Sequence, residues 1–290
     1  MFRKILVSLT GFESDRDALD AAYLVGRLFG AHLDCICPRS SPTQVAIGAT
    51  PFEIGAAMNA AELIADLQKE NELRTSNART AFDEFCDKQH IVNQAKPDAS
   101  VSAAWREVSG DEVEATIAEA RFYDLVVLGR PQQVTGLSVN GLGAVLVASG
   151  RPLLLVPKTP PDNIAPTVAI AWKEGAEAAR ALAAAAPLIA KAQKIVVLAA
   201  DEGDSKAAAR IQSAERLAAQ LRRRGASTEA RLVVPGGRAL ADAVMETATA
   251  CGADVLVMGG YGHSRLSELV FGGFTRQVLT ASTLPVFVFH

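Results

Sequence analysis

Short apolar runs alternate with longer amphipathic stretches along the whole chain. In the first part of the sequence they predict strands over 4–9, 32–37, 100–105, 125–129 and 153–156, and helices over 15–29, 60–88, 111–120 and 142–149. After residue 166 the same order predicts strands over 168–171, 195–199, 228–234, 255–259 and 286–289, and helices over 177–188, 205–224, 239–250 and 275–281. Strands that alternate with helices of this length must pair in parallel, because each helix returns the chain to start the next strand in the same direction.

The fourth predicted strand of each half carries nearly the same sequence. Asp124-Leu-Val-Val-Leu-Gly129 and Asp254-Val-Leu-Val-Met-Gly259 lie 130 residues apart, and each precedes an apolar run that contains a proline, Pro152 or Pro285. The two prolines are 133 residues apart, so the second copy holds three more residues between its last two strands. We therefore predict two copies of one domain, 1–157 and 167–290, joined by the proline-rich linker 158–166.

Composition and charge narrow the classes of partner. The chain has 29 basic and 32 acidic residues and a net charge of −3, which gives no electrostatic footprint for nucleic acid or an anionic membrane. Gly11 and Glu13 interrupt the first apolar stretch before a signal-peptide core is complete. No uninterrupted apolar stretch reaches the length of about 20 residues that a membrane span needs. We expect a cytoplasmic protein.

The reactive residue types form no recognisable catalytic or metal-binding pattern. The four cysteines match no zinc spacing and are expected to be core thiols: Cys35, Cys37, Cys86 and Cys251. The four histidines are scattered over different elements: His32, His90, His263 and His290. Three serines that might suggest a nucleophile have no identifiable His and Asp partners: Ser14, Ser264 and Ser267. We expect neither an intrinsic metal site nor an enzyme.

Glycines concentrate after the fourth strand of the second copy, at Gly259, Gly262, Gly272 and Gly273. Glycine lets a backbone approach a ligand closely, and a glycine pair before a helix leaves amide groups free to point at an anion. Phosphate is the anion that we expect such a turn to bind. Thr275 could cap the helix or donate its hydroxyl, and Arg265 or Arg276 could supply positive charge. The alternative is that the glycines serve only the turn from strand to helix.

Other nucleotide-binding signatures are absent from the sequence. There is no Gly-Lys-Ser or Gly-Lys-Thr of a Walker loop, and no Gly-x-Gly-x-x-Gly follows the first strand of either copy. Residues 10–15 also lack the Ser-Gly-Gly-x-Asp-Ser loop of ATP pyrophosphatases. Hydride transfer and adenylation are therefore not favoured.

Two five-stranded α/β units, the second with Gly-x2-Gly-x9-Gly at Gly259, Gly262 and Gly272, resemble a tandem universal stress protein over nearly the whole chain. The resemblance implies an α/β fold of two repeated parallel open sheets of the adenine nucleotide alpha hydrolase-like type. It also implies that the halves pack about a pseudo-twofold axis through 153–156 and 286–289, so that one chain mimics a dimer. Whether two chains pair further as a homodimer is left open.

The resemblance further implies that the second copy binds ATP or another adenine nucleotide as a regulatory ligand in a stress response, with Mg²⁺ as a companion of the phosphates. The candidate binding residues are Gly259, Gly262, His263, Arg265, Gly272, Gly273, Phe274, Thr275 and Lys173. His263 could donate to a phosphate or pack on the loop.

This chain departs from the family pattern at three places. The family usually has Ser or Thr directly after the last motif glycine, where this chain has Gly273. It also usually has an acidic residue at the end of the first strand, where this chain has Thr10 and Lys173, and a lysine cannot accept a hydrogen bond from the adenine amino group. Gly129-Arg-Pro-Gln132 lacks the second glycine, so the first copy is not expected to bind nucleotide. The alternative function is an interaction module whose glycine loop binds another anion or nothing.

Overall fold

The computed structural model describes residues 1–39, 60–91, 101–130, 138–159, 162–260 and 273–290. The first half contains β1 Lys4–Ser8, α1 Ser14–Phe29, β2 His32–Arg39, α4 Ala60–Gln89, β3 Ser102–Ser109, α5 Glu112–Ala120, β4 Leu125–Gly129, α6 Val139–Ala148 and β5 Leu153–Val156. The second half contains β6 Thr167–Ala171, α7 Ala176–Ala184, α8 Ala186–Ile189, β7 Lys194–Ala200, α9 Ala207–Arg222, β8 Ser227–Val233, α10 Leu240–Ala250, β9 Val255–Gly259, α11 Gly273–Ala281 and β10 Val286–Phe289.

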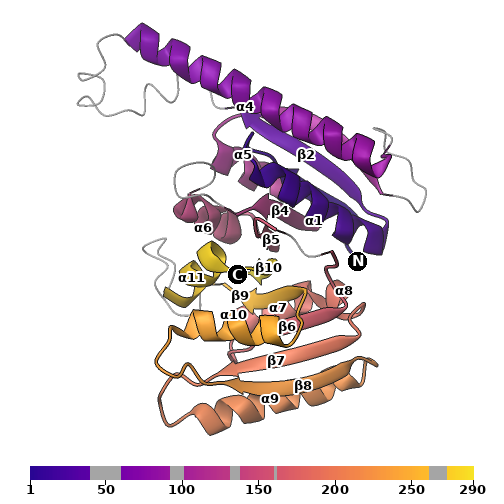
Figure 1. The fold of residues 1–290 in the computed structure, drawn as a ribbon, viewed down its shortest axis with the longest axis vertical. Helices are drawn as coiled ribbons and strands as arrows, with labels where there is room; N and C mark the ends of the chain where they lie inside the picture. The colour runs from indigo at the N-terminus through magenta and orange to yellow at the C-terminus, as the bar shows by residue number, and fades with distance from the viewer. Residues whose placement is uncertain (40–59, 92–100, 131–137, 160–161, 261–272) are drawn as a thin grey trace.

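The expected pair of parallel five-stranded units is confirmed, and the two units form one sheet (Figure 1). The strand order is β3-β2-β1-β4-β5-β10-β9-β6-β7-β8. Within each half the neighbouring strands are parallel, whereas β5 and β10 pair antiparallel with Phe287 opposite Leu154. The order reads the same from either end, so the halves are related by a pseudo-twofold axis through the pair of strands that the sequence analysis named.

One expected helix is divided in two. The sequence predicts a single helix over 177–188, but α7 ends at Ala184 and α8 begins at Ala186. Pro187 lies in the first turn of α8, where its missing N–H costs little, whereas in the middle of a continuous helix it would remove a hydrogen bond. The single-helix prediction was therefore wrong at this proline.

The aspartate of the repeated strand motif has a structural role in both halves. The Asp124 carboxylate accepts hydrogen bonds from the backbone N–H groups of Arg3 at 2.7 Å and Lys4 at 3.0 Å. The Asp254 carboxylate accepts one from the N–H of Thr167 at 2.6 Å. Each aspartate thus fixes the start of the first strand of its half beside the start of the fourth.

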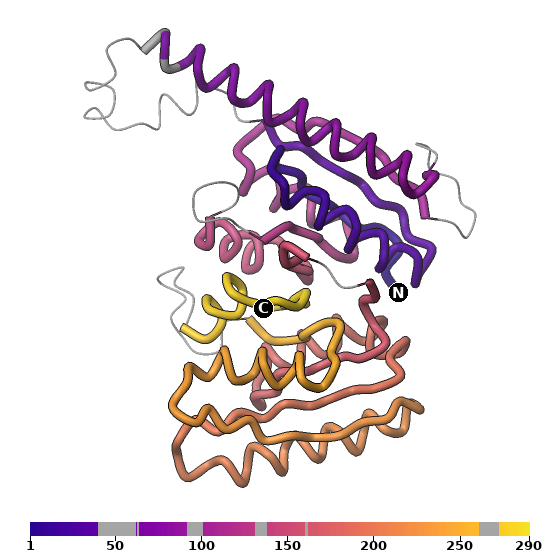
Figure 2. The backbone as a smooth tube through the Cα atoms, viewed as in Figure 1, coloured from indigo at the N-terminus to yellow at the C-terminus, as the bar shows by residue number. Residues whose placement is uncertain are grey.

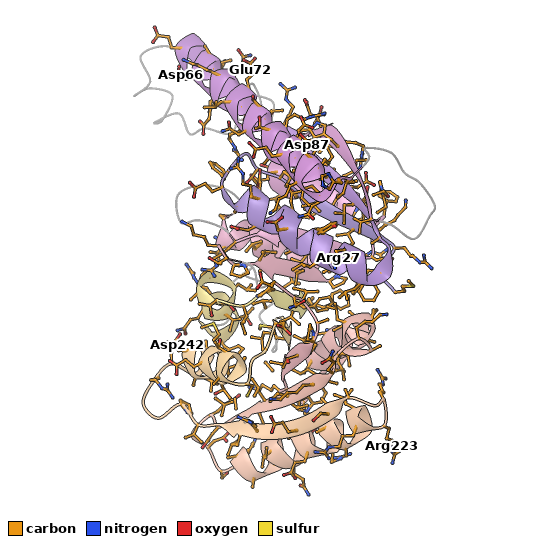
Figure 3. The ribbon with its side chains drawn as sticks, turned by 45° about the vertical axis from the view of Figure 1, so that its right-hand side comes forward. Arg27, Asp66, Glu72, Asp87, Arg223 and Asp242 are labelled. Atoms are coloured by element: carbon orange, nitrogen blue, oxygen red, sulfur yellow. The ribbon has the colours of Figure 1, made fainter. Side chains whose placement is uncertain are left out.

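Helices cover both faces of the sheet. Side chains from α1, α4, α8 and α9 pack on one face, and those from α5, α6, α10 and α11 pack on the other. The joint between the halves is the antiparallel pair of β5 and β10 with the side chains packed around it. Both chain ends lie near this joint (Figure 2). Charged side chains of the long helix α4, such as Asp66, Glu72 and Asp87, point away from the sheet (Figure 3). No helix in the described part of the chain combines the length and the apolar character that crossing a membrane demands.

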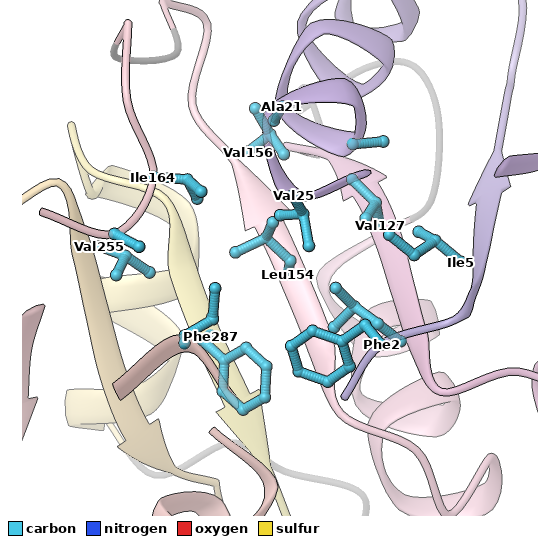
Figure 4. Close-up of a cluster of buried hydrophobic side chains, with 14 of the residues drawn as sticks. Phe2, Ile5, Ala21, Val25, Val127, Leu154, Val156, Ile164, Val255 and Phe287 are labelled. Carbon is cyan, nitrogen blue, oxygen red and sulfur yellow. The ribbon is translucent and has the colours of Figure 1, made fainter. Parts of the chain in front are cut away.

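Aromatic side chains close the joint on one face (Figure 4). Phe287 of β10 is fully buried, and its ring centroid lies 6.2 Å from that of Phe2. Phe2 in turn makes an edge-on contact with Phe29 of α1, with 5.4 Å between the centroids. The core on this face is therefore continuous from one half to the other.

We expect Phe287→Ala to lower the free energy of unfolding by about 3–5 kcal/mol, because it opens a cavity at the joint. Phe122→Ala is the matched control, since Phe122 is 75% exposed and its truncation should change stability by no more than about 0.5 kcal/mol. Urea unfolding followed by circular dichroism measures both. Equal losses in the two variants would contradict the role of the joint.

Candidate functional site

The carboxyl ends of β6, β7 and β9 lie at one edge of the second half. The chain runs from β6 outward through β7 to β8, and then returns to β9 on the opposite side of β6. Ligands of open α/β sheets bind outside the carboxyl ends of strands at such a reversal. Lys173 follows β6, and Gly259 ends β9, so the structure brings two of the candidate residues to this edge.

Four of the nine candidate binding residues lie outside the described part of the chain: Gly262, His263, Arg265 and Gly272. The structure places the other five: Gly259, Gly273, Phe274, Thr275 and Lys173.

Gly259 has a packing role that the sequence analysis did not foresee. A Cβ atom at this position would lie 2.7 Å from the backbone nitrogen of Ala178 in α7. Gly129, its counterpart in the first half, packs in the same way, with a Cβ atom 2.6 Å from that of Ser14 in α1. Both halves therefore need glycine here to bring the first helix onto the fourth strand. The binding role of Gly259 stays a prediction.

The amino-terminal turn of α11 has the features of an anion site. Its first amide groups have no acceptor within the helical ladder, and the preceding residue, Gly272, has no side chain that could cap them. Among the described residues, no atom lies within 4 Å of where a Cβ atom on Gly273 would be. In the first half, by contrast, the Ser138 hydroxyl caps α6 and accepts from the N–H of Gly141 at 3.0 Å.

Thr275 does not cap α11. It lies within the first turn instead of before it, and it is 8% exposed. The expected capping role was therefore wrong, because the helix begins two residues earlier than the sequence predicted. Phe274 is partly buried and packs against the core on the α10 and α11 face.

Lys173 is exposed and forms an ion pair with a residue that the sequence analysis missed. Its Nζ atom lies 2.8 Å from Oε1 of Glu202, which follows β7 at the same edge of the sheet. The other carboxylate oxygen of Glu202 lies 3.1 Å from Nη2 of Arg210, and Arg210 also pairs with Asp204 at 2.6 Å. The site therefore carries a fixed carboxylate beside the lysine. The position of Glu202, three residues after a predicted strand, was the only signal in the sequence.

Two neighbouring contacts hold the chain as it leaves β6. The indole N–H of Trp172 donates to the Ser213 hydroxyl at 3.0 Å, and that hydroxyl donates to the Glu174 carboxylate at 2.7 Å. Because Ser213 lies on α9, the residues on both sides of Lys173 are tied to that helix.

The equivalent edge of the first half is filled by the protein itself. Gly11 has φ +80°, and a Cβ atom there would lie 2.3 Å from the carbonyl oxygen of Arg74 in α4. The Arg74 guanidinium donates to the Thr10 carbonyl at 2.8 Å. The buried Asp15 carboxylate accepts from the N–H groups of Thr10 at 2.9 Å and Gly11 at 2.7 Å, and burial raises its pKa to about 6. The backbone of α4 therefore lies against the turn after β1.

The other reactive side chains comprise buried cysteines and histidines with hydrogen-bond partners, and of these His290 follows β10 at the same edge. All four cysteines are free and buried, which confirms the expectation of core thiols, and burial raises the pKa of Cys37 and Cys86 to about 11. His32 pairs with the Ser102 hydroxyl at 2.8 Å, and His290 lies 3.2 Å from the Gly260 carbonyl oxygen. Within the described ranges, no group of three or more His, Cys, Asp or Glu side chains is arranged to hold a metal ion.

Sequence comparison finds a family model and a relative that each match part of the chain. Residues 159–290 match the model of the universal stress protein family. The universal stress protein Slr1230 of Synechocystis sp. is 29% identical over 175 residues. That alignment covers 58% of this chain and 58% of the relative, so the match spans little more than half of either protein.

Solved structures match the whole chain. A universal stress protein from Archaeoglobus fulgidus has a TM-score of 0.65 and 15% identity, with 99% of this chain and 97% of that chain covered. A protein of unknown function from Pseudomonas aeruginosa PAO1 has a TM-score of 0.55 and 17% identity, with coverage of 99% and 92%. At these identities the likeness shows the fold.

The buried Asp15 predicts a pH dependence of stability. Its pKa is raised in the folded protein, so the folded state binds the proton more tightly than the unfolded chain. Its contribution is therefore present in full below about pH 4 and is lost as the pH rises through about 6. Asp15→Asn removes this titration.

We expect the difference in unfolding free energy, wild type minus Asp15→Asn, to fall by on the order of 2–3 kcal/mol between pH 4 and pH 7. Urea unfolding at half-unit pH steps measures the difference. A difference that stays flat or rises with pH would show that the carboxylate is not the group that titrates.

Proposed function

We propose that this chain, whose second half belongs to the universal stress protein family, binds an adenine nucleotide at the carboxyl edge of that half as a regulatory ligand. The nucleotide is ATP or ADP, with Mg²⁺ as a companion of the phosphates. The proposed setting is a stress response in the cytoplasm.

The observation that carries the proposal is the amino-terminal turn of α11, where no described atom occupies the space beside Gly273. A helix of nine residues starts at the edge where open sheets bind ligands, and glycines precede it. The amides of its first turn and the positive end of its dipole would stabilise a phosphate. The first half supports the assignment by contrast, because Ser138 already caps α6 and Arg74 packs against the turn after β1. We propose one nucleotide per chain.

Glu202 offers the hydrogen-bond acceptor for adenine that Lys173 cannot provide. A lysine cannot accept a hydrogen bond from the adenine amino group, whereas an ionised carboxylate can. Glu202 lies 2.8 Å from Lys173 and is held from its other side by Arg210, so it is an ordered acceptor beside a donor. We propose that Glu202 accepts from the base and that Lys173 donates to it.

We propose that turnover is absent or very slow. The described part of the edge offers a lysine and a carboxylate that are ion-paired with each other. Its Ser213 hydroxyl is held between the Trp172 indole and the Glu174 carboxylate, which makes it part of a structural contact. A phosphate-release assay with ATP tests this point. Release faster than about one phosphate per minute would favour an ATP-hydrolysing enzyme instead.

The alternative is an interaction module whose glycine loop binds another anion or nothing. Titration calorimetry with ATP and ADP, using protein freed of carried-over nucleotide, separates the two functions. No binding at millimolar nucleotide would reject our proposal, and binding of inorganic tripolyphosphate without any preference for ATP would favour an anion site.

Gly273→Val should weaken ATP binding about tenfold or more, because the Cα–Cβ bond of a helical residue tilts toward the amino terminus, where the phosphate would lie. No described atom lies within 4 Å of the position that a Cβ atom on residue 273 would take, so we expect the fold to tolerate the change. Asn140→Val, at the matching position of the first half, is the control and should leave the affinity unchanged. If the Gly273→Val and Asn140→Val variants bind ATP with equal affinity, the phosphates do not lie beside the first turn of α11.

Glu202→Ala should weaken ATP binding about threefold to tenfold, because it removes one hydrogen-bond acceptor from the base. Tripolyphosphate, which has no base, should bind the variant as it binds the wild type. Glu174→Ala is the control, since that carboxylate accepts from Ser213 at the same edge. If the two glutamate variants lose ATP affinity equally, Glu202 has no special role in reading the base.

A further inference from the structure

Arg130 in the first half and Gly260 in the second half occupy equivalent positions. Each is the first residue after the fourth strand of its half. The N–H of Arg130 donates to the carbonyl of Val156, the last residue of β5, at 2.9 Å. The N–H of Gly260 donates to the carbonyl of Phe289, the last residue of β10, at 2.8 Å. The backbone geometry is therefore the same, and only the side chain differs.

Both positions face the opposite half of the molecule. Because β5 and β10 are antiparallel, the carboxyl end of β4 lies beside the segment that leads into β10. At Gly260 a Cβ atom would lie 2.7 Å from Cδ2 of Leu146 in α6, so the second half needs glycine for close packing. At Arg130 the side chain crosses the joint, and its guanidinium donates to the carbonyl of Ser282.

Ser282 lies at the carboxyl-terminal end of α11. Its N–H donates to the carbonyl of Val278 at 3.0 Å, which continues the hydrogen-bond pattern of the helix by one residue. Ser282 is 3% exposed, so the Arg130 contact is made inside the joint. Burial lowers the pKa of Arg130, but a guanidinium stays charged in proteins. A half-buried cation therefore lies at the negative end of the α11 dipole.

We infer that Arg130 is a positioning residue for the anion site, acting through α11 from its other end. This inference rests on the proposed function of the second half. A cation at the carboxyl end and an anion at the amino end both stabilise the same nine-residue helix. The first half would thus take part in binding without holding a ligand, through the residue that directly follows the one motif glycine it keeps, Gly129.

The coupling between the Arg130 contact and anion binding has to act in both directions. If Arg130 raises the affinity of the amino-terminal turn for an anion, the bound anion must strengthen the contact between Arg130 and α11 by the same factor. Nucleotide binding would then tighten the joint between the halves.

Titration calorimetry on the full-length chain with ATP, tripolyphosphate and adenosine tests the inference. Arg130→Met removes the charge and keeps most of the side-chain length. It should weaken ATP and tripolyphosphate about threefold to tenfold, leave adenosine unchanged, and be largely rescued by Arg130→Lys. A merely structural role would weaken adenosine to the same extent.

Arg151→Met is the matched control. The Arg151 guanidinium donates to the carbonyl of Arg121, at the carboxyl-terminal end of α5, at 2.8 Å. It makes the same kind of contact on a helix that is not part of the site, so its loss should leave all three affinities unchanged. If Arg130→Met does not fold, Arg130→Gln keeps an N–H donor without the charge and should show the same selective losses.

Two results would overturn the inference. Unchanged binding of the phosphate-bearing probes by a folded Arg130 variant would reject it and leave the proposed function intact. Failure of the wild type to bind either ATP or tripolyphosphate would reject both.

Discussion

The antiparallel pairing of β5 with β10 is the constraint on which the rest of the structure depends. Within each half the strands are parallel, so each half has a single carboxyl edge. Pairing the last strands antiparallel places these two edges at opposite ends of the sheet. It also brings α6 against α11 on one face and joins the aromatic core of Phe2 and Phe287 on the other. The ends of helices from one half thereby come within reach of residues that follow strands in the other half.

Most of the fold could be predicted from the sequence because it follows from local patterns. The apolar runs and the repeated Asp124 and Asp254 motifs predict the strands, and the linker separates the repeats. The error at α7 and α8 arose because amphipathic spacing continues across Pro187, although the backbone hydrogen bonds do not.

The candidate site could be predicted only in part. Glycine spacing indicated the edge, but a glycine that permits packing and one that permits ligand approach look alike in a sequence. Gly259 shows the difficulty, since its contact with α7 exists only in the folded chain. Glu202 and Arg130 were missed because their partners, Lys173 and Ser282, are distant in sequence and become neighbours through strand order.

Joining the two units in one chain explains how the halves could diverge. In a symmetric dimer of identical subunits, one residue type must serve an equivalent position on both sides of the axis. A glycine there would allow close packing on α6 but could not reach the end of α11. An arginine could reach that end but would collide with Leu146 on the other side. The tandem chain removes this conflict, because Gly260 and Arg130 are separate positions in one sequence. One half can therefore keep an open helix terminus while the other supplies the cation that supports it.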